Sequence, residues 1–87
     1  MISAAFPANL LLPYTQANAA RLAGVAQRFQ ASSRLERGGK SVNARSVLGI
    51  LAIMAESGPQ VIITCDGADE QAALRALEQA LSSGSGV

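Results

Sequence analysis

The chain has 87 residues, carries a formal net charge of +1, and is 49% hydrophobic but only 3% aromatic. This length predicts one small domain over residues 1–87, and the near-balanced charge with few aromatics argues against a nucleic-acid surface. The sequence has one cysteine and no histidine. These counts exclude an internal disulfide and any imidazole chemistry, and they argue against a metal centre.

The sequence also indicates where the protein works. A single cysteine suits a reducing compartment. The first twenty residues carry no charged side chain, but they lack a basic start and contain Pro7 and Pro13, unlike a signal peptide. No apolar run approaches the roughly 18 residues that a membrane helix needs. We therefore expect a cytoplasmic protein that contacts no membrane, and we predict no cofactor.

The first third of the chain predicts one strand and one helix. Ile2, Ala4 and Phe6 alternate as in a strand, and Pro7, which lacks an amide donor, puts that strand at a sheet edge or ends it. A helix is predicted over residues 16–29, with Thr15 as its N-cap. Its apolar stripe consists of Ala19, Leu22, Ala23, Val25, Ala26 and Phe29.

The rest of the chain predicts a hairpin and a second strand–helix unit. The Gly38-Gly39 pair is a strong signal for a tight hairpin turn, with Leu35 and Val42 on the inward face. Residues 82–87 form a Ser/Gly tail that we expect to fray. The predicted elements are strands over 32–37 and 40–43, a helix over 46–54, a strand over 60–65 and a helix over 69–81.

The predicted order of elements is therefore β-α-β-β-α-β-α. Three helices and a four-stranded antiparallel sheet make a two-layer α+β sandwich, in which the helices cover the sheet. The β-branched, apolar stretch at 60–65 is typical of an interior strand. The sequence shows no repeat, linker or second domain.

Ser46 stands directly before the most apolar stretch of the chain and has two interpretations. As an N-cap it would accept a backbone N–H of the first turn, and its loss would cost on the order of 1 kcal/mol. As a phosphorylation site it would place a dianion at the positive end of a helix, which tolerates such a charge. The pattern alone allows both.

The helix that follows Ser46 is too apolar to bury all of its side chains against one sheet. Some of Val47, Leu48 and Leu51 should be exposed, and an exposed apolar patch often marks a partner surface. A loop or the N-terminal segment covering these side chains is the equal alternative. No catalytic residue is predicted anywhere in the chain, so we do not expect an enzyme.

Two other groups of polar residues have structural and functional interpretations. Thr15 and Gln16 open the first helix, and Arg21 lies one turn further along, so this helix start could bind an anion or be an ordinary capped terminus. The cluster Asp66, Asp69 and Glu70 could attract a hard cation, but its spacing matches no calcium loop and suits a turn and a helix start.

The stretch GGKSVNARSVLGILAI at 38–53 resembles the signature of the HPr family around its regulatory serine. The residues at matching positions are Gly39, Lys40, Val42, Asn43, Ser46 and Gly49, and Arg45 replaces a lysine. The closing segment CDGADEQAALRALEQAL and the stretch AQRFQASSRLE are also similar to the family. The resemblance covers almost the whole chain and implies the same order of elements.

Members of the family carry phosphate on one histidine at the start of the first helix, within a His-Ala-Arg-Pro-Ala motif. The resemblance places Thr15 at this position in an ungapped match, or Gln16 with a shift of one residue. The motif's arginine and proline are also missing. The resemblance therefore implies that carrier chemistry is lost, as in the histidine-lacking Crh type, with Arg21 and Arg45 as candidates to support a phosphate.

The resemblance implies a regulatory protein phosphorylated at Ser46 that acts through protein–protein binding in carbon or nitrogen regulation. Its partners would be HPr kinase/phosphorylase, a transcriptional regulator or phosphotransferase-system components, docking at Val47, Leu48 and Leu51. A phosphocarrier with an atypical acceptor and a degenerate interaction domain are the alternatives. The uncharged N-terminal strand with Pro7 could also support a homodimer, by strand exchange.

Overall fold

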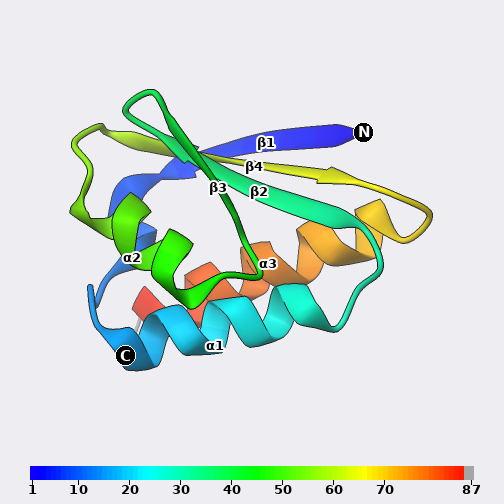
Figure 1. Cartoon of the computed structure of the whole chain (residues 1–87), viewed down its shortest axis with the longest axis horizontal. Coiled ribbons are helices and arrows are strands. Elements are labelled where there is room, and N and C mark those ends of the chain that lie inside the picture. The colour runs from blue at the N-terminus through cyan, green and yellow to red at the C-terminus, as the bar shows by residue number, and fades with distance from the viewer. Residues whose placement is uncertain (86–87) are drawn as a thin grey trace.

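A computed structural model describes residues 1–85 of the chain. Helices cover one face of a four-stranded sheet and leave the other face open (Figure 1). The α+β order and the antiparallel sheet predicted from the sequence are confirmed. The elements are β1 (Ile2–Pro7), the short 3-10 helix η1 (Ala8–Leu11), α1 (Gln16–Gln27), β2 (Ser32–Arg37), β3 (Lys40–Asn43), α2 (Val47–Ala55), β4 (Gln60–Asp66) and α3 (Glu70–Ser85).

The strands lie in the order β1-β4-β2-β3, so β4 is interior and β1 and β3 are the edges. Both predictions, the interior position of residues 60–65 and the edge position of the Pro7 strand, are confirmed. Side chains of β4 alternate between the two faces: Val61 and Ile63 are buried under the helices, whereas Ile62 lies on the open face with 36% of its surface exposed.

The hairpin between β2 and β3 turns at Gly38 and Gly39, whose φ angles are 59° and 83°. Two successive positive φ values belong to the primed turn that matches the twist of the strands. A Cβ atom on Gly38 would also lie 2.2 Å from the carbonyl oxygen of Ser57, so glycine is required there for packing as well. Leu35 and Val42 pair across the ladder, as expected.

The core is aliphatic and lies between the sheet and the helices. It includes Ala19, Leu22, Ala23 and Ala26 of α1, Ile50 and Ile53 of α2, and Ala73, Leu77 and Leu81 of α3. Arg37 holds the end of α2 in place, because its Nε donates to the carbonyl of Gly58 at 3.0 Å and its Nη1 donates to that of Ile53 at 3.2 Å. Within the described residues, no helix is long and apolar enough to cross a membrane.

Two helix ends and one short element differ from the prediction, and the other predicted bounds agree within one residue. Helix α1 ends at Gln27 rather than residue 29, because the N–H groups of Arg28 and Phe29 turn to the carbonyls three residues back. Helix α3 continues through Ser85, so the expected frayed tail is wrong for residues 82–85, since extending an existing helix gains one hydrogen bond per residue. Residues 86–87 of that tail lie outside the described residues. The 3-10 helix at Ala8–Leu11 was not predicted.

Candidate functional site

The connection from β3 to α2 presents Ser46 at the start of a helix. The N–H of Ser46 donates to the carbonyl of Asn43 at 3.1 Å, and the N–H of Arg45 donates to the Asn43 side chain at 2.9 Å. Ser46 is extended, and its Oγ accepts the N–H of Gly49 at 3.0 Å. The N-cap interpretation is confirmed, and the half-buried hydroxyl lies at the positive end of α2.

Gly49 allows the first turn of α2 to lie directly against β3. A Cβ atom at this position would be 3.1 Å from the Cβ of Val42, 3.2 Å from the carbonyl oxygen of Asn43 and 3.3 Å from the Cβ of Ser46. Those distances are tighter than ordinary van der Waals contact. The glycine of the predicted signature therefore sets how closely the Ser46 cap approaches the sheet.

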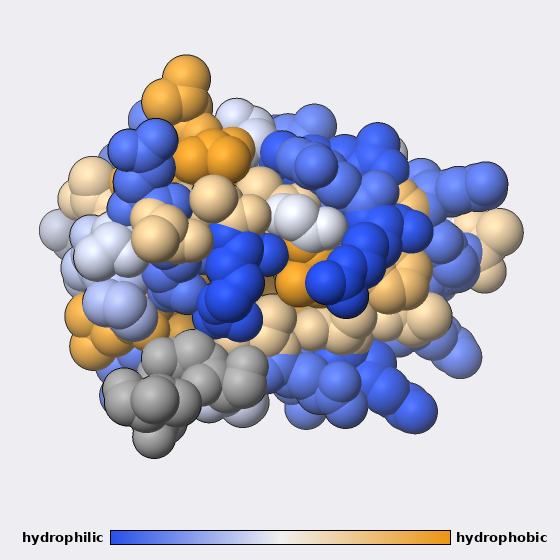
Figure 2. Space-filling model, turned by 90° about the horizontal axis from the view of Figure 1, so that it is seen from below, coloured by the Kyte–Doolittle hydropathy of each residue, from blue (hydrophilic) through white to orange (hydrophobic). Residues whose placement is uncertain are grey.

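The apolar side chains after Ser46 divide between the core and the surface. Leu48 is 78% exposed, whereas Val47 and Leu51 are half-buried and pack against the core. We call these three residues the α2 patch. The expectation that some of these side chains are exposed is confirmed, and Leu48 is the most exposed of the three. Figure 2 shows the helical side of the molecule, where hydrophobic side chains reach the surface in several places between hydrophilic ones, most prominently at the upper left.

Two more large apolar side chains are exposed in the segment that leads into α1. Leu12 is 45% exposed and Tyr14 is 44% exposed, on either side of Pro13. The guanidinium carbon of Arg37 lies 5.7 Å from the centre of the Tyr14 ring, within the range of a cation–π contact. Sequence reasoning assigned neither side chain a role. The signal that could have found them is their position in a loop, where no periodic face can bury them.

The start of α1 holds the two candidates for the lost histidine position. Thr15 caps the helix, since its Oγ1 accepts the N–H of Asn18 at 3.2 Å, and Gln16 is the first helical residue. Both side chains are exposed. Asn18 is only 6% exposed, and its amide donates to the carbonyls of Leu11 at 2.9 Å and Pro13 at 3.1 Å. Asn18, which has no predicted role, therefore fastens the loop that carries Thr15.

The two arginines predicted to support a phosphate are bound to other groups. Arg21 donates through Nε and Nη2 to Oδ1 of Asn18, at 3.1 Å and 2.8 Å. The guanidinium of Arg45 donates to the carbonyl of Phe29, beyond the end of α1, although Arg45 directly precedes Ser46. Their predicted role toward a phosphate stays a prediction.

Two members of the acidic cluster, Asp69 and Glu70, accept backbone N–H groups, whereas the Asp66 carboxylate lies 3.5 Å from the N-terminal ammonium group. The carboxylate of Asp69 accepts the N–H of Gln30 at 2.9 Å and that of Ala31 at 2.8 Å, and these bonds, the one from Gln30 first, hold the Asp69 pKa below its ordinary value. Glu70 accepts the N–H of Gly67 at 3.1 Å, which lowers its pKa in the same way. Over residues 1–85, no three Asp, Glu, Cys or His side chains are placed to hold a metal ion.

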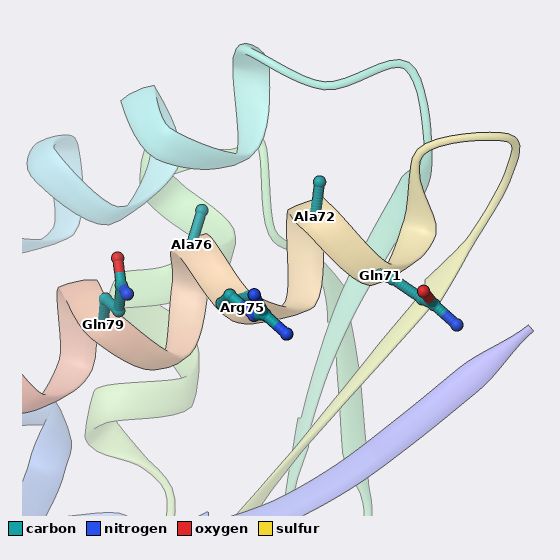
Figure 3. Close-up of a pocket in the computed structure, with 5 residues that line it drawn as sticks. All are labelled: Gln71, Ala72, Arg75, Ala76 and Gln79. Carbon is teal, nitrogen blue, oxygen red and sulfur yellow. The ribbon is translucent and has the colours of Figure 1, made fainter.

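A shallow depression lies along α3 (Figure 3). Its lining consists of Gln71, Ala72, Arg75, Ala76 and Gln79. In Figure 3 the two alanines point toward α1, while Gln71 and Arg75 point away from the molecule. The lining contains no nucleophile and no acid–base pair, so it offers no chemistry of its own.

Known structures share this architecture. The structure of HPr-C-His from Thermoanaerobacter tengcongensis superposes with a TM-score of 0.86 at 26% identity, covering 100% of this chain and 98% of that one. The structure of Crh from Bacillus subtilis gives 0.71 at 33% identity over 79% of each chain, and it is described as an intertwined dimer with a swapping domain. The open sheet with one helical layer is therefore the HPr-type fold.

Sequence comparison assigns the family. A family model for the PTS HPr component phosphorylation site matches residues 16–83. The phosphocarrier protein HPr of Xylella fastidiosa is 33% identical over 60 residues, which is 69% of this chain and 67% of the relative. The HPr-like protein Crh of Bacillus subtilis is 40% identical over 52 residues, which is 60% of this chain and 61% of the relative. The chain belongs to the HPr family, as its signature around Ser46 indicated.

Proposed function

We propose that this protein is a regulatory member of the HPr family that is phosphorylated on Ser46 and carries no phosphate on a histidine. The observation that carries the proposal is the combination of an HPr-family chain without histidine and a half-buried serine that caps the start of α2. Thr15 and Gln16 offer no substitute, since a phosphothreonine is an ester without the high transfer potential of a phosphohistidine, and the amide nitrogen of glutamine is not a nucleophile. We propose a single cytoplasmic domain.

The chemistry at Ser46 follows from its position. In the modification, Oγ of Ser46 attacks the γ-phosphorus of ATP, ADP leaves, and the hydroxyl proton passes to a base of the kinase. The product carries about −1.5 to −2 charges at a helix N-terminus, where the backbone amides and the dipole favour an anion. The backbone N–H of Gly49, which now bonds to Oγ, is available to the phosphate oxygens. The fold should therefore survive the modification.

The surface around Ser46 suits a role in protein binding. The α2 patch gives it an apolar centre at Leu48, which is 78% exposed. Neither α1 nor α2 contains an Asp or Glu, and Arg21, Arg28 and Arg45 lie on or beside these helices. A phosphate would therefore add strong negative charge to a surface that is otherwise apolar and basic. We propose that HPr kinase/phosphorylase, a transcriptional regulator or phosphotransferase-system components bind here.

Self-association is a separate part of the proposal. The edge strand β1 has no charged side chain, and natural proteins usually protect such an edge. Since the Crh relative is described as a swapped dimer, we propose that two copies of this chain associate through β1.

Mass spectrometry of the intact protein tests the proposed modification directly. The protein is incubated with ATP and HPr kinase/phosphorylase, and separately with phosphoenolpyruvate and enzyme I. We expect one phosphate in the ATP reaction, none in the phosphoenolpyruvate reaction, and loss of the phosphate in Ser46→Ala. The matched control is Ser41→Ala, a nearby exposed serine on β3, which should still be phosphorylated.

The reaction with ATP and the reaction with phosphoenolpyruvate together distinguish a regulatory protein from a phosphocarrier and from a degenerate binding domain. Phosphate transferred from enzyme I would mean that the chain is a phosphocarrier with an atypical acceptor, and peptide mapping would identify it at Thr15 or elsewhere. No phosphate in either reaction would contradict the proposal and leave a degenerate domain that only binds. Phosphate in the ATP reaction that persists in Ser46→Ala would exclude Ser46 as the site.

A further inference from the structure

We propose that Arg45 is a switch between two acceptors: the carbonyl of Phe29 in the unmodified protein, and the phosphate once Ser46 is modified. The inference rests on the phosphorylation of Ser46 proposed above. Its consequence is that modification at the start of α2 releases the end of α1. The signal would then reach a second element without refolding the domain.

The first observation is that Arg45 joins two elements. Figure 1 shows the connection from β3 descending to α1 before α2 begins. The guanidinium of Arg45 donates to the carbonyl of Phe29, and the side-chain amide of Gln27 donates back to the carbonyl of Arg45 at 3.0 Å. One residue, directly before Ser46, is thus bound twice to the end of α1.

The second observation is that the segment between α1 and β2 is held from two sides. On one side the carboxylate of Asp69 accepts the N–H groups of Gln30 and Ala31. This side is closely packed, because a Cβ atom on Gly67 would lie 2.7 Å from the Cα of Ala31. On the other side the segment is held by the exposed side chain of Arg45. The Arg45 contact is therefore the one that can be exchanged.

The third observation is the difference between the two acceptors. The Phe29 carbonyl is neutral, whereas a phosphate on the adjacent residue would be close to a dianion. The guanidinium is charged in both cases, so the phosphate adds an attraction between opposite charges and can accept two N–H groups at once. Arg21, Arg34 and Arg37 already donate to other groups in the fold. Arg45 directly precedes Ser46, so a rotation of its side chain should bring the guanidinium to the Ser46 phosphate. We therefore expect the guanidinium to bind the phosphate in place of the Phe29 carbonyl.

Loss of Arg45 should loosen the last turn of α1. The N–H of Arg28 reaches the carbonyl of Val25 at 3.2 Å, and the N–H of Phe29 reaches that of Ala26 at 3.3 Å. Both are long for N–H to oxygen bonds, so this turn depends on its outside contacts. The bonds from Gln30 and Ala31 to Asp69 should persist, which confines the change to the end of α1.

Nuclear magnetic resonance on protein with phosphoserine incorporated genetically at position 46 tests the switch without any kinase. Against the unmodified chain, we expect a downfield shift of the Arg45 Nε–H signal and an upfield shift of the Phe29 carbonyl carbon. Hydrogen exchange at the Arg28 and Phe29 amides should become several-fold faster, while that at Ala31 stays unchanged.

Two variants make the test specific. In Arg45→Gln the Phe29 carbonyl carbon should show the upfield shift even without phosphoserine, because its hydrogen bond to Arg45 is gone. Phosphoserine at position 46 should then cause no further shift of this signal. In Arg34→Gln, which removes an exposed arginine that donates to Ser41 instead, the full response should remain. Unchanged Arg45 and Phe29 signals in the phosphoserine protein would overturn the switch. Because the phosphate is built in, this result is independent of whether a kinase modifies Ser46.

Discussion

At the scale of single residues, Ser46 combines a structural role with a proposed regulatory one, and the two can be separated. Its Oγ caps α2 through the Gly49 N–H. We expect Ser46→Ala to lower the free energy of unfolding by about 1 kcal/mol, whereas Ser46→Asp should be nearly neutral, because aspartate caps well and its charge suits the helix dipole. Urea denaturation measures both. A loss in Ser46→Asp as large as in Ser46→Ala would contradict the cap geometry.

Leu48 is a large apolar side chain that the fold leaves 78% exposed. We expect Leu48→Ala to change the free energy of unfolding by less than about 0.5 kcal/mol, since the side chain is on the surface. Phosphorylation by HPr kinase/phosphorylase should nevertheless show a raised KM. Steady-state kinetics measure this, with Ile62→Ala on the open sheet face as the control. Equal kinetics for both variants would exclude the α2 patch as the docking surface.

At the scale of elements, two helical glycines should respond in opposite ways to the same substitution. Alanine favours a helix by up to about 1 kcal/mol over glycine. We expect Gly24→Ala in α1 to stabilise the protein, because the new Cβ meets nothing within 4 Å. Gly49→Ala should destabilise it, because that Cβ would press on β3 and on Ser46. Thermal denaturation compares them, and stabilisation by both would show that α2 can move off the sheet.

The link between α3 and the α1–β2 connection should weaken in acid. The backbone N–H of Gln30, followed by that of Ala31, lowers the Asp69 pKa in the folded state. A lowered folded pKa gives stability that is complete above the ordinary carboxyl pKa and is lost as the pH falls toward the folded value. We expect Asp69→Asn to be less stable at neutral pH and to lose less on acidification. Denaturation as a function of pH measures this.

The exposed carboxylate Glu78 on α3 supplies the control for that experiment. Glu78→Gln should keep the acid-dependent loss of the unmodified protein. If Asp69→Asn and Glu78→Gln lose stability equally as the pH falls, the contacts of Asp69 with the α1–β2 connection do not contribute to the pH dependence.

The elements show why sequence reasoning succeeded locally and failed over distance. Thr15, Ser46 and the Gly38-Gly39 turn were predicted because each acts on backbone a few residues away. The bonds that Arg45 donates to Phe29 and that Asp69 accepts from Gln30 were not predicted, because a backbone carbonyl or N–H group leaves no signal in the sequence of its distant partner. Asn18 was also missed, although its amide reaches carbonyls only five and seven residues back, because the pattern does not show that this side chain turns back to the loop before α1.

At the scale of the whole molecule, the unprotected edge of β1 should control self-association. We expect light scattering to detect dimers at high protein concentration and Ala5→Lys to shift the equilibrium to monomers, because a lysine on an edge strand discourages pairing. Ala5 is exposed and lies opposite Ile62 in the ladder. The control, Gln71→Lys on α3, adds the same charge elsewhere. Equal behaviour of the two variants would exclude β1 as the interface.

The strand order has a consequence for synthesis on the ribosome. All partners of β1 lie in β4, where Ile2 pairs with Cys65 and Pro7 with Gln60. At elongation rates of about 5–20 residues per second, β4 is synthesised roughly 3–12 s after β1. During that interval an uncharged, strand-forming segment has no partner within its own chain. The nascent protein should therefore present β1 to chaperones as an extended segment, and β1 should join the sheet only when translation is nearly complete.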